Sequence, residues 1–291
     1  MALQPAPSAQ RTVEIVRFLA GNPAEVFAVA DLARRVGQSR ATCQAVLLAL
    51  EPSQWVIRTR DGYTLGPGLI SVGAAAQQGT AVVGLLRGAV RDLYEHTGCE
   101  VLGYLPAGDQ LINVSRVGPN VPGSFTMVEG QAFPLAPPYG LAFAAWDERD
   151  LDLWLERATG ASAPTQSRLR KAAEIVRELG YSIILDPVTR RELRSNVDSL
   201  SQARQKFVAS ALAHDDLVVR DADTANAMRV SLLSGPVFGS DGKVSALMGL
   251  VFDVRQHVDM AELTTALKAA CRQLSERLGA PPVAALEELP A

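Results

Sequence analysis

Several features that mark secreted or membrane proteins are missing from this sequence. Its three cysteines, Cys43, Cys99 and Cys271, are far apart and odd in number, which argues against a disulfide framework and fits a reducing compartment. No run of about 18 apolar residues occurs, so we expect no membrane span. The opening MALQPAPSAQ lacks a basic segment followed by an apolar one, and predicts a loose leader without a secretory signal. These absences predict a cytoplasmic protein.

Motifs for catalysis and metal binding are also missing. The chain has no G-x-S-x-G nucleophile elbow, no H-E-x-x-H zinc motif and no phosphate-binding P-loop. His96 and Cys99 lie three residues apart, but no second pair completes a tetrahedral metal site. The acidic residues between Asp215 and Asp223 form a solvated run. We therefore expect no catalytic residue, no metal, no cofactor, and a protein that is not an enzyme.

Charge is divided unequally along the chain. The length of 291 residues predicts about two domains, each with its own core. Residues 1–66 hold seven arginines and five acidic residues, a net charge of +2, whereas the rest carries −5. A small basic unit joined to an acidic body favours phosphate contact at one end.

Three helices are predicted in the basic part. Residues 12–20 form the first, with Val13, Val16 and Leu19 at helical spacing, and Gly21-Asn22-Pro23 ends it. Gly37 ends the second, whose apolar face carries Leu32, Ala33 and Val36. Ser39 can cap the third, which runs to about Leu50. The third helix buries Val46, Leu47 and Leu50 and turns Arg40, Ala41, Gln44 and Ala45 outward.

Two short β-type runs follow, Trp55–Arg58 and Tyr63–Leu65, with Asp61-Gly62 as a hairpin turn. Helix, tight turn, helix and two-stranded ribbon are the layout of a winged helix-turn-helix. Arginine suits guanine, glutamine suits adenine, and serine or threonine can hold phosphate. A merely solvated helix face is the alternative. The predicted DNA-contacting residues are Arg34, Arg35, Gln38, Ser39, Arg40, Thr42, Gln44, Arg58 and Arg60.

The chain beyond the ribbon reads first as helix and then as a mixed domain. Residues 69–96 are helical with a break near 78–80, and a stripe of Leu85, Leu86, Val90 and Leu93 predicts dimerisation against a second copy. Strands follow at 99–105, 110–117, 124–128 and 181–186, helices at 140–146, 151–159 and 166–179, a helix-rich stretch at 187–223, a hairpin around 239–242 and a last helix at 259–278. This predicts an α+β domain with an antiparallel sheet between helices.

With these residues laid out, the chain resembles the IclR family of bacterial transcription regulators from about Gln10 to Gly279. The resemblance rests on the order of ADLARRVGQSRAT, YTLGPGL, GQAFPLAPPYGLAFAAW, ELGYSI and GPVFGSDGKVSALMGLVF. It implies a winged helix-turn-helix at 1–66, a linker helix at 67–97, a GAF/PAS-like effector-binding domain at 98–283 and a tail at 284–291. The sequence departs from the family at Ala45, where an arginine is usual, and at Ser53-Gln54, where a glycine is usual.

The resemblance also implies a ligand cavity in the second domain. The candidate effector-binding residues are Met127, Phe133, Gly140, Ser231, Leu233, Ser234, Met248 and Leu250. An apolar lining predicts a hydrophobic or aromatic ligand, oriented by groups such as Ser231 and Ser234. Ordinary core packing is the competing interpretation of the apolar members.

The sequence therefore predicts a ligand-responsive DNA-binding regulator, most simply a repressor, whose partners are double-stranded DNA, a small-molecule effector and a second copy. A homodimer or homotetramer would engage the half-sites of a near-palindrome. The alternative is a small-molecule-binding protein whose head is a protein-interaction or vestigial module. The salt dependence of DNA affinity separates the two, because a protein that neutralises several phosphates must bind more weakly as salt rises.

Overall fold

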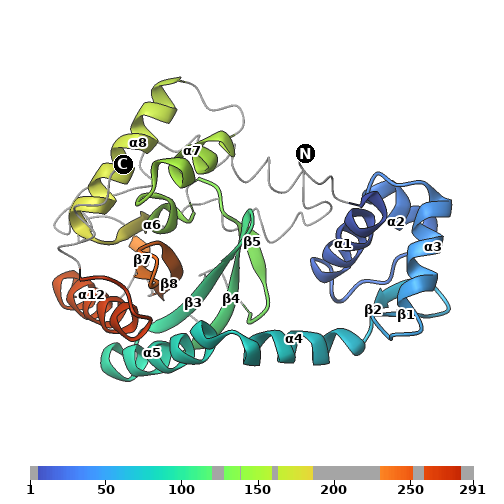
Figure 1. Ribbon diagram of the computed structural model, residues 1–291, viewed down its shortest axis with the longest axis horizontal. Coiled ribbons are helices and arrows are strands. Elements are labelled where there is room, and N and C mark those ends of the chain that lie inside the picture. Colours follow the sequence, from blue (N-terminus) through green and yellow to red (C-terminus); the bar gives the residue numbers. More distant parts are fainter. Residues whose placement is uncertain are drawn as a thin grey trace. The chain divides into compact units, whose positions relative to one another are not determined.

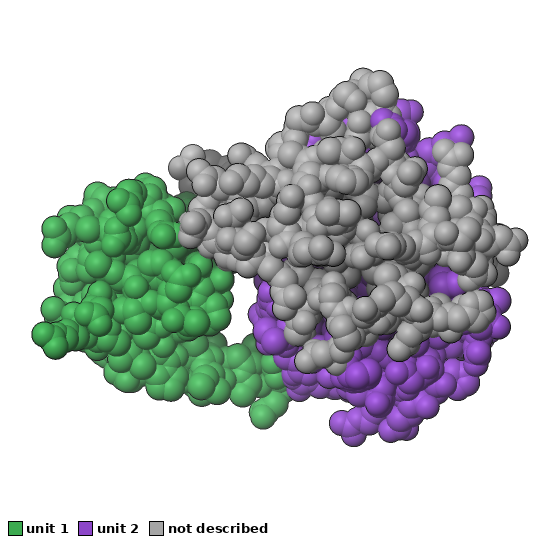
Figure 2. All heavy atoms as spheres, turned by 180° about the vertical axis from the view of Figure 1, so that it is seen from behind, with its two compact units in different colours: residues 1–80, 197–203 green, residues 81–196, 204–291 purple. Residues whose placement is uncertain are grey.

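The computed structural model describes residues 6–119, 128–137, 139–158, 163–185, 230–251 and 259–282. The helix-rich stretch predicted at 187–223 and most of the strand predicted at 124–128 lie outside these ranges. The chain divides into two compact units; described residues up to Thr80 belong to the first and those from Ala81 onward to the second (Figure 2). Each unit has its own buried apolar core.

The first unit begins with three helices and a two-stranded ribbon (Figure 1). They are α1 (Pro7–Ala20), α2 (Val29–Arg35), α3 (Arg40–Leu50), β1 (Val56–Arg58) and β2 (Tyr63–Leu65). The prediction of a loose leader is wrong from Pro7 onward, because proline suits a first helical turn whose amides have no partner. The inner face of α1 carries Ile15, Phe18 and Leu19. Val13 was expected on that face and is instead 49% exposed.

Local signals at the turns of this unit are confirmed. Gly37 has a φ of 66°, the left-handed conformation that ends a helix, and Ser39 caps α3 by accepting a hydrogen bond from the Thr42 amide at 3.0 Å. Gly62 has a φ of 152°, and a Cβ there would lie 2.2 Å from the carbonyl oxygen of Phe27. Phe27 pairs with Tyr63, so the segment between α1 and α2 is tied to the ribbon.

The break predicted near residues 78–80 is confirmed, because the linker divides at Thr80 into α4 (Gly68–Gly79) and α5 (Ala81–Thr97). No residue of α4 is buried. Leu86, Val90 and Leu93 of α5 are buried in the core of the second unit, with Leu85 half-buried against it. The prediction that this stripe packs against a second copy is therefore wrong. Among the described helices none alone is long and apolar enough to cross a membrane; α4 and α5 meet that criterion only as a broken pair.

The second unit is built on a six-stranded antiparallel sheet with strand order β5-β4-β3-β8-β7-β6. The strands are β3 (Glu100–Ala107), β4 (Gln110–Val117), β5 (Ala132–Pro134), β6 (Ser182–Leu185), β7 (Val230–Phe238) and β8 (Val244–Val251). The expected hairpin is confirmed as β7 and β8, with a turn closed by the hydrogen bond from the Gly239 amide to the Lys243 carbonyl at 2.8 Å.

Helices cover both faces of the sheet (Figure 1). The face covered by α5 and α12 (Met260–Arg277), here the α12 face, holds one apolar cluster. The opposite face, here the α6 face, packs against α6 (Leu141–Ala144), α7 (Glu148–Glu156) and α8 (Ala163–Leu179) around the fully buried Trp154. The α+β fold class with an antiparallel sheet between helices is confirmed.

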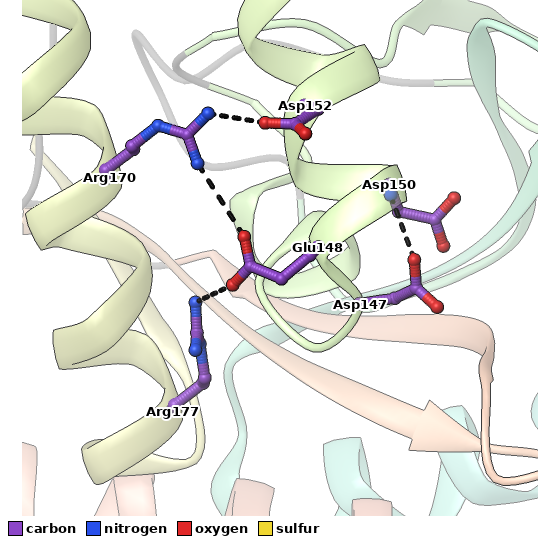
Figure 3. Close-up of polar contacts among 6 residues, drawn as sticks. All are labelled: Asp147, Glu148, Asp150, Asp152, Arg170 and Arg177. Carbon is purple, nitrogen blue, oxygen red and sulfur yellow. Dashed lines mark hydrogen bonds and ion pairs between the residues drawn. The ribbon is translucent and has the colours of Figure 1, made fainter. Parts of the chain in front are cut away.

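Ion pairs join α7 to α8 (Figure 3). Glu148 contacts Arg177 at 3.1 Å and Arg170 at 3.7 Å, and Asp152 also pairs with Arg170. Asp147 caps α7 by accepting a hydrogen bond from the Asp150 amide at 3.1 Å, so the helix begins before the predicted Leu151. These side chains are about half exposed, so each pair contributes little to stability, and the buried faces of the two helices hold them together.

Candidate nucleic-acid interface and effector face

The helix expected to read DNA, α3, presents a defined outer face. Cys43, Leu47 and Leu50 turn inward into the apolar core. Arg40 is exposed and Gln44 is half-buried at the border of that face. Burial raises the pKa of the Cys43 thiol, which disfavours the reactive thiolate, and the side chain packs in the core of this unit.

The ribbon formed by β1 and β2 presents two further cations. Arg58 ends β1 and Arg60 lies in the hairpin loop, and both side chains are exposed. Within the described part of the chain, neither these two arginines nor Arg40 forms an ion pair, so all three guanidinium groups can approach phosphate. The structure therefore places three of the predicted DNA-contacting arginines on the surface of α3 and the adjacent ribbon.

The other predicted DNA-contacting residues have partners within the head. Arg34 pairs with Asp31 at 2.7 Å while its side chain remains 75% exposed, and Arg35 lies over the Phe27 ring at 5.5 Å. The Ser39 and Thr42 hydroxyls lie 2.8 Å apart, so both serve the cap of α3. The side-chain amide of Gln38 donates a hydrogen bond to the carboxylate of Glu14 on α1 at 2.8 Å.

Glu14 was not among the predicted site residues, although it orients one of them. It lies 24 positions before Gln38 in the chain. Nothing in the local pattern of either segment signals this contact, because it depends on how α1 packs beside the turn that precedes α3. A carboxylate at this place also opposes the approach of a phosphate.

The predicted effector-binding residues lie on opposite faces of the sheet. Leu233, Met248 and Leu250 are fully buried on the α12 face, within the cluster formed with α5 and α12. Successive residues of a strand point to opposite faces, so these three are not brought together with Phe133 and Gly140. Met127 lies outside the described residues, and so does the side chain of Ser231.

The remaining candidates gather on the α6 face. Phe133 is half-buried, and its ring meets Tyr104 edge-on at 5.3 Å and Tyr139 at 5.9 Å between centroids. Ser234 is 6% exposed and stands next to Leu232 of the cluster on this face. Gly140 has a φ of 78°, and a Cβ there would lie 2.2 Å from Leu135 Cδ1, so only glycine fits before α6.

Three polar residues on the same face were missed by the sequence analysis. Glu100 is opposite Val251, Arg116 is opposite Leu102, and Asn113 is opposite Tyr104. Directly opposed residues of antiparallel strands point to the same face, and these three neighbours belong to the apolar cluster of the α6 face. The sequence did contain a signal for them: Glu100 lies inside the predicted strand 99–105, and Asn113 and Arg116 lie inside the predicted strand 110–117, where apolar residues predominate.

Two of these residues, Glu100 and Asn113, are buried and incompletely paired. Arg116 Nε donates to Glu100 Oε1 at 2.6 Å, and the Glu100 side chain is 1% exposed. Asn113 Oδ1 accepts from the Ser115 amide at 3.2 Å. Glu100 Oε2 and Asn113 Nδ2 are buried without a hydrogen-bond partner, a condition that costs about 1–3 kcal/mol for each group. Across the described ranges, no three His, Cys, Asp or Glu side chains gather as a metal site would require.

No family model matches the chain, and no curated protein matches it in sequence. Solved structures do match. An IclR transcriptional regulator from Alicyclobacillus acidocaldarius is 21% identical with a TM-score of 0.66, covering 94% of this chain and 99% of that one. Pseudomonas aeruginosa HmgR is 21% identical with a TM-score of 0.59, covering 94% and 100%.

A third match is an IclR homolog from Microbacterium hydrocarbonoxydans complexed with 4-hydroxybenzoate. It is 14% identical with a TM-score of 0.61, and the match covers 93% of this chain and 98% of that one. The chain therefore has the fold of the IclR-type transcriptional regulators over nearly its whole length. The resemblance drawn from the sequence is confirmed at the level of the fold.

Proposed function

We propose that this protein is a ligand-responsive transcription regulator that binds double-stranded DNA through its first unit. The observation that carries the proposal is the α2–turn–α3–ribbon arrangement with Arg40, Arg58 and Arg60 exposed around α3. The fold shared with IclR-type regulators supports the same conclusion. We do not propose a catalytic role, and only measured turnover of a substrate would support one.

In this proposal α3 enters the major groove and the ribbon lies against the backbone. Arg40 and Gln44 reach base edges from the first half of the helix, while Arg58 and Arg60 contact phosphates. Arg34 remains exposed enough to contact phosphate despite its pairing with Asp31. Ser39 and Thr42 take a different part, because their hydroxyls hold the first turn of α3 in place.

A second copy of the chain is proposed to cover α4. No charged residue occurs from Gly62 to Leu86, yet Ile70 of α4 is 74% exposed and Val72 is 46% exposed. Apolar side chains gain free energy when a partner removes them from water. A twofold dimer formed here would carry two heads for the two half-sites of a near-palindromic operator, and two such dimers would form a tetramer. Repression follows if the occupied operator blocks transcription.

The effector is proposed to bind over the α6 face of the sheet. Tyr104, Phe133 and Tyr139 offer aromatic edges, and Ser234, Asn113 and Glu100 offer polar atoms. A small aromatic molecule with one hydrogen-bond donor for Glu100 Oε2 and one acceptor for Asn113 Nδ2 matches this set. The bound 4-hydroxybenzoate of the Microbacterium hydrocarbonoxydans homolog supports an aromatic ligand. To act as a signal, the ligand must bind the DNA-competent and DNA-incompetent states unequally, typically by a factor of about 5–150.

The test of DNA binding uses the purified full-length protein and duplexes from upstream of its own coding sequence, at two salt concentrations. We expect tight binding that weakens steeply with salt, and Arg40→Ala should weaken it by about 1–3 kcal/mol because a base contact is removed. Arg149→Ala is the matched control, because it removes one exposed arginine from α7 in the second unit. Undetectable binding at low salt by a folded protein contradicts the proposal.

The test of the dimer is the sedimentation behaviour of Ile70→Glu. A buried charge at the interface should shift the protein toward the monomer, whereas Val13→Glu, at an exposed apolar position of α1, should not. A wild-type protein that is monomeric at micromolar concentration would contradict this part of the proposal and leave DNA binding untouched.

The alternative is a small-molecule-binding protein whose head contacts another protein. The modest net charge of +2 on residues 1–66 is the observation that favours it. Salt-insensitive behaviour toward every DNA tested, together with saturable binding of an aromatic ligand, would support this alternative.

A further inference from the structure

The outermost stripe of α3 is apolar. Ala41, Ala45 and Leu48 follow one another at spacings of four and three residues, which places them on one face of the helix. Both alanines are exposed and Leu48 is 51% exposed. They lie opposite Cys43 and Leu47, which are fully buried. These three residues are called the α3 crest below.

Hydrogen-bonding side chains stand beside the crest and not on it. Arg40 and Gln44 each precede a crest alanine by one position, and one position turns a helix by about 100°. Thr42 follows Ala41, but its hydroxyl is held by Ser39 at 2.8 Å. The part of α3 that projects furthest from the core therefore offers methyl groups, with a guanidinium and an amide on one flank.

The floor of the major groove presents one apolar group, the C5-methyl of thymine; guanine, cytosine and adenine present hydrogen-bonding groups there. Resting on the proposed DNA-binding function, we propose that the α3 crest reads thymine methyl groups. Ala41 and Ala45 are one helical turn apart, about 6 Å, so they reach thymines within about two base-pair steps of one another. Gln44 beside them suits an adenine of the same A·T-rich half-site.

The composition of the crest favours DNA over a protein as its occupant. Alanine is depleted in protein–protein interfaces, whose strongest contacts come from tryptophan, tyrosine and arginine. Arg40 precedes the crest on α3, Arg58 and Arg60 lie on the ribbon that follows α3, and all three are exposed, which gives this unit charge complementary to phosphate. Two bare methyl groups next to Arg40 and Gln44 fit a methyl-bearing base better than a protein side chain, because an alanine allows the helix backbone to approach the groove closely.

The test begins with selection of a duplex from a randomised pool by the full-length protein. Each thymine of the selected site is then replaced singly by uracil, which removes the methyl group and keeps base pairing unchanged. We expect a loss of affinity of about fourfold at each thymine covered by the crest, the worth of one buried methyl-sized group. Thymines elsewhere in the site should tolerate the replacement.

Protein variants assign each thymine to its residue. In Ala45→Gly the uracil penalty should vanish at one thymine and persist at the other. Ala49→Gly is the matched control, since residue 49 is exposed on the same helix but off the crest, and glycine costs the helix about the same. Leu48→Ala removes the largest apolar side chain of the crest and introduces a residue that favours helix. The uracil penalty can therefore be measured in this variant even if the glycine variants fold poorly.

The possible outcomes distinguish failure of the methyl readout from failure of the proposed DNA-binding function. Salt-sensitive DNA binding with no thymine sensitive to uracil overturns the methyl readout and leaves the regulator proposal standing. A uracil penalty that is unchanged in Ala45→Gly, Ala41→Gly and Leu48→Ala also overturns it, because the methyls would then act through DNA shape. Failure to enrich or bind any duplex at low salt is the failure of the proposed function itself.

Discussion

Gln38, in the turn between α2 and α3, donates its side-chain amide to the carboxylate of Glu14 on α1 at 2.8 Å. The contact joins the first helix of the head to the beginning of the helix that is proposed to read DNA. If the proposed function holds, this contact withholds from DNA a side chain that would otherwise suit adenine, and it places a negative charge beside the proposed DNA-binding surface.

Replacing Glu14 with alanine is expected to strengthen DNA binding severalfold, because it removes a carboxylate near the phosphates and frees Gln38. The free energy of unfolding should change by less than about 1 kcal/mol, since the pair is exposed. Fluorescence anisotropy with a fixed duplex measures the affinity. Glu25→Ala removes an exposed carboxylate elsewhere in the head; an equal gain from this control would show that only bulk charge matters.

The buried pair of Glu100 and Arg116 should be sensitive to the loss of either partner alone. Arg116→Met leaves the Glu100 carboxylate buried without its cation, and we expect a loss of about 2–3 kcal/mol in the free energy of unfolding. This is below the ~3–5 kcal/mol of a fully buried pair because Arg116 is 20% exposed. Urea denaturation provides the measurement.

The double variant Glu100→Gln with Arg116→Met is the control for that prediction. It removes both charges and should recover much of the lost stability. If the single Arg116→Met variant were as stable as wild type, the carboxylate would not be confined as the structure shows.

Gly140→Ala is expected to destabilise the second unit by about 1–3 kcal/mol. The residue has a φ of 78°, and a Cβ would lie 2.2 Å from Leu135 Cδ1, so both backbone strain and overpacking oppose the change. Gly88→Ala is the matched control: it lies within α5 with nothing within 4 Å of an added Cβ, and should stabilise the protein by about 0.5–1 kcal/mol. Opposite shifts in Tm are the expected result, and a shared direction would contradict it.

Acid should weaken the second unit partly through Asp147. The hydrogen bond from the Asp150 amide (Figure 3) lowers the pKa of Asp147 below its usual value, and so does Lys243, whose Nζ lies 3.2 Å from Asp147 Oδ2. A lowered folded-state pKa contributes stability above the usual aspartate pKa of about 3.9, and this stability is lost as the pH falls through the folded-state value.

The corresponding experiment compares wild type with Asp147→Asn by urea denaturation between neutral and acid pH. Asparagine keeps the cap of α7 but cannot titrate, so the variant should lose less stability than wild type as the pH falls. Parallel pH profiles would show that the Asp147 carboxylate does not contribute.

Short-range physics determined much of this protein from its sequence. The cap at Ser39, the left-handed turn at Gly37 and the hairpin at Asp61-Gly62 depend on interactions within a few residues, and the structure has all three. Apolar spacing predicted most of the described helices and strands for the same reason, although the short strand β5 was missed, and their order was enough to predict the α+β fold.

Tertiary structure alone decided which surfaces those elements share. The stripe of α5 was visible in the sequence, but its partner is the sheet and α12 of its own unit, which no local pattern specifies. Leu233 and Ser234 are neighbours in the chain and lie on opposite faces of the sheet, so their places depend on strand pairing across long separations. The contacts Glu14–Gln38 and Glu100–Arg116 arise in the same way, because they exist only once distant segments have packed together.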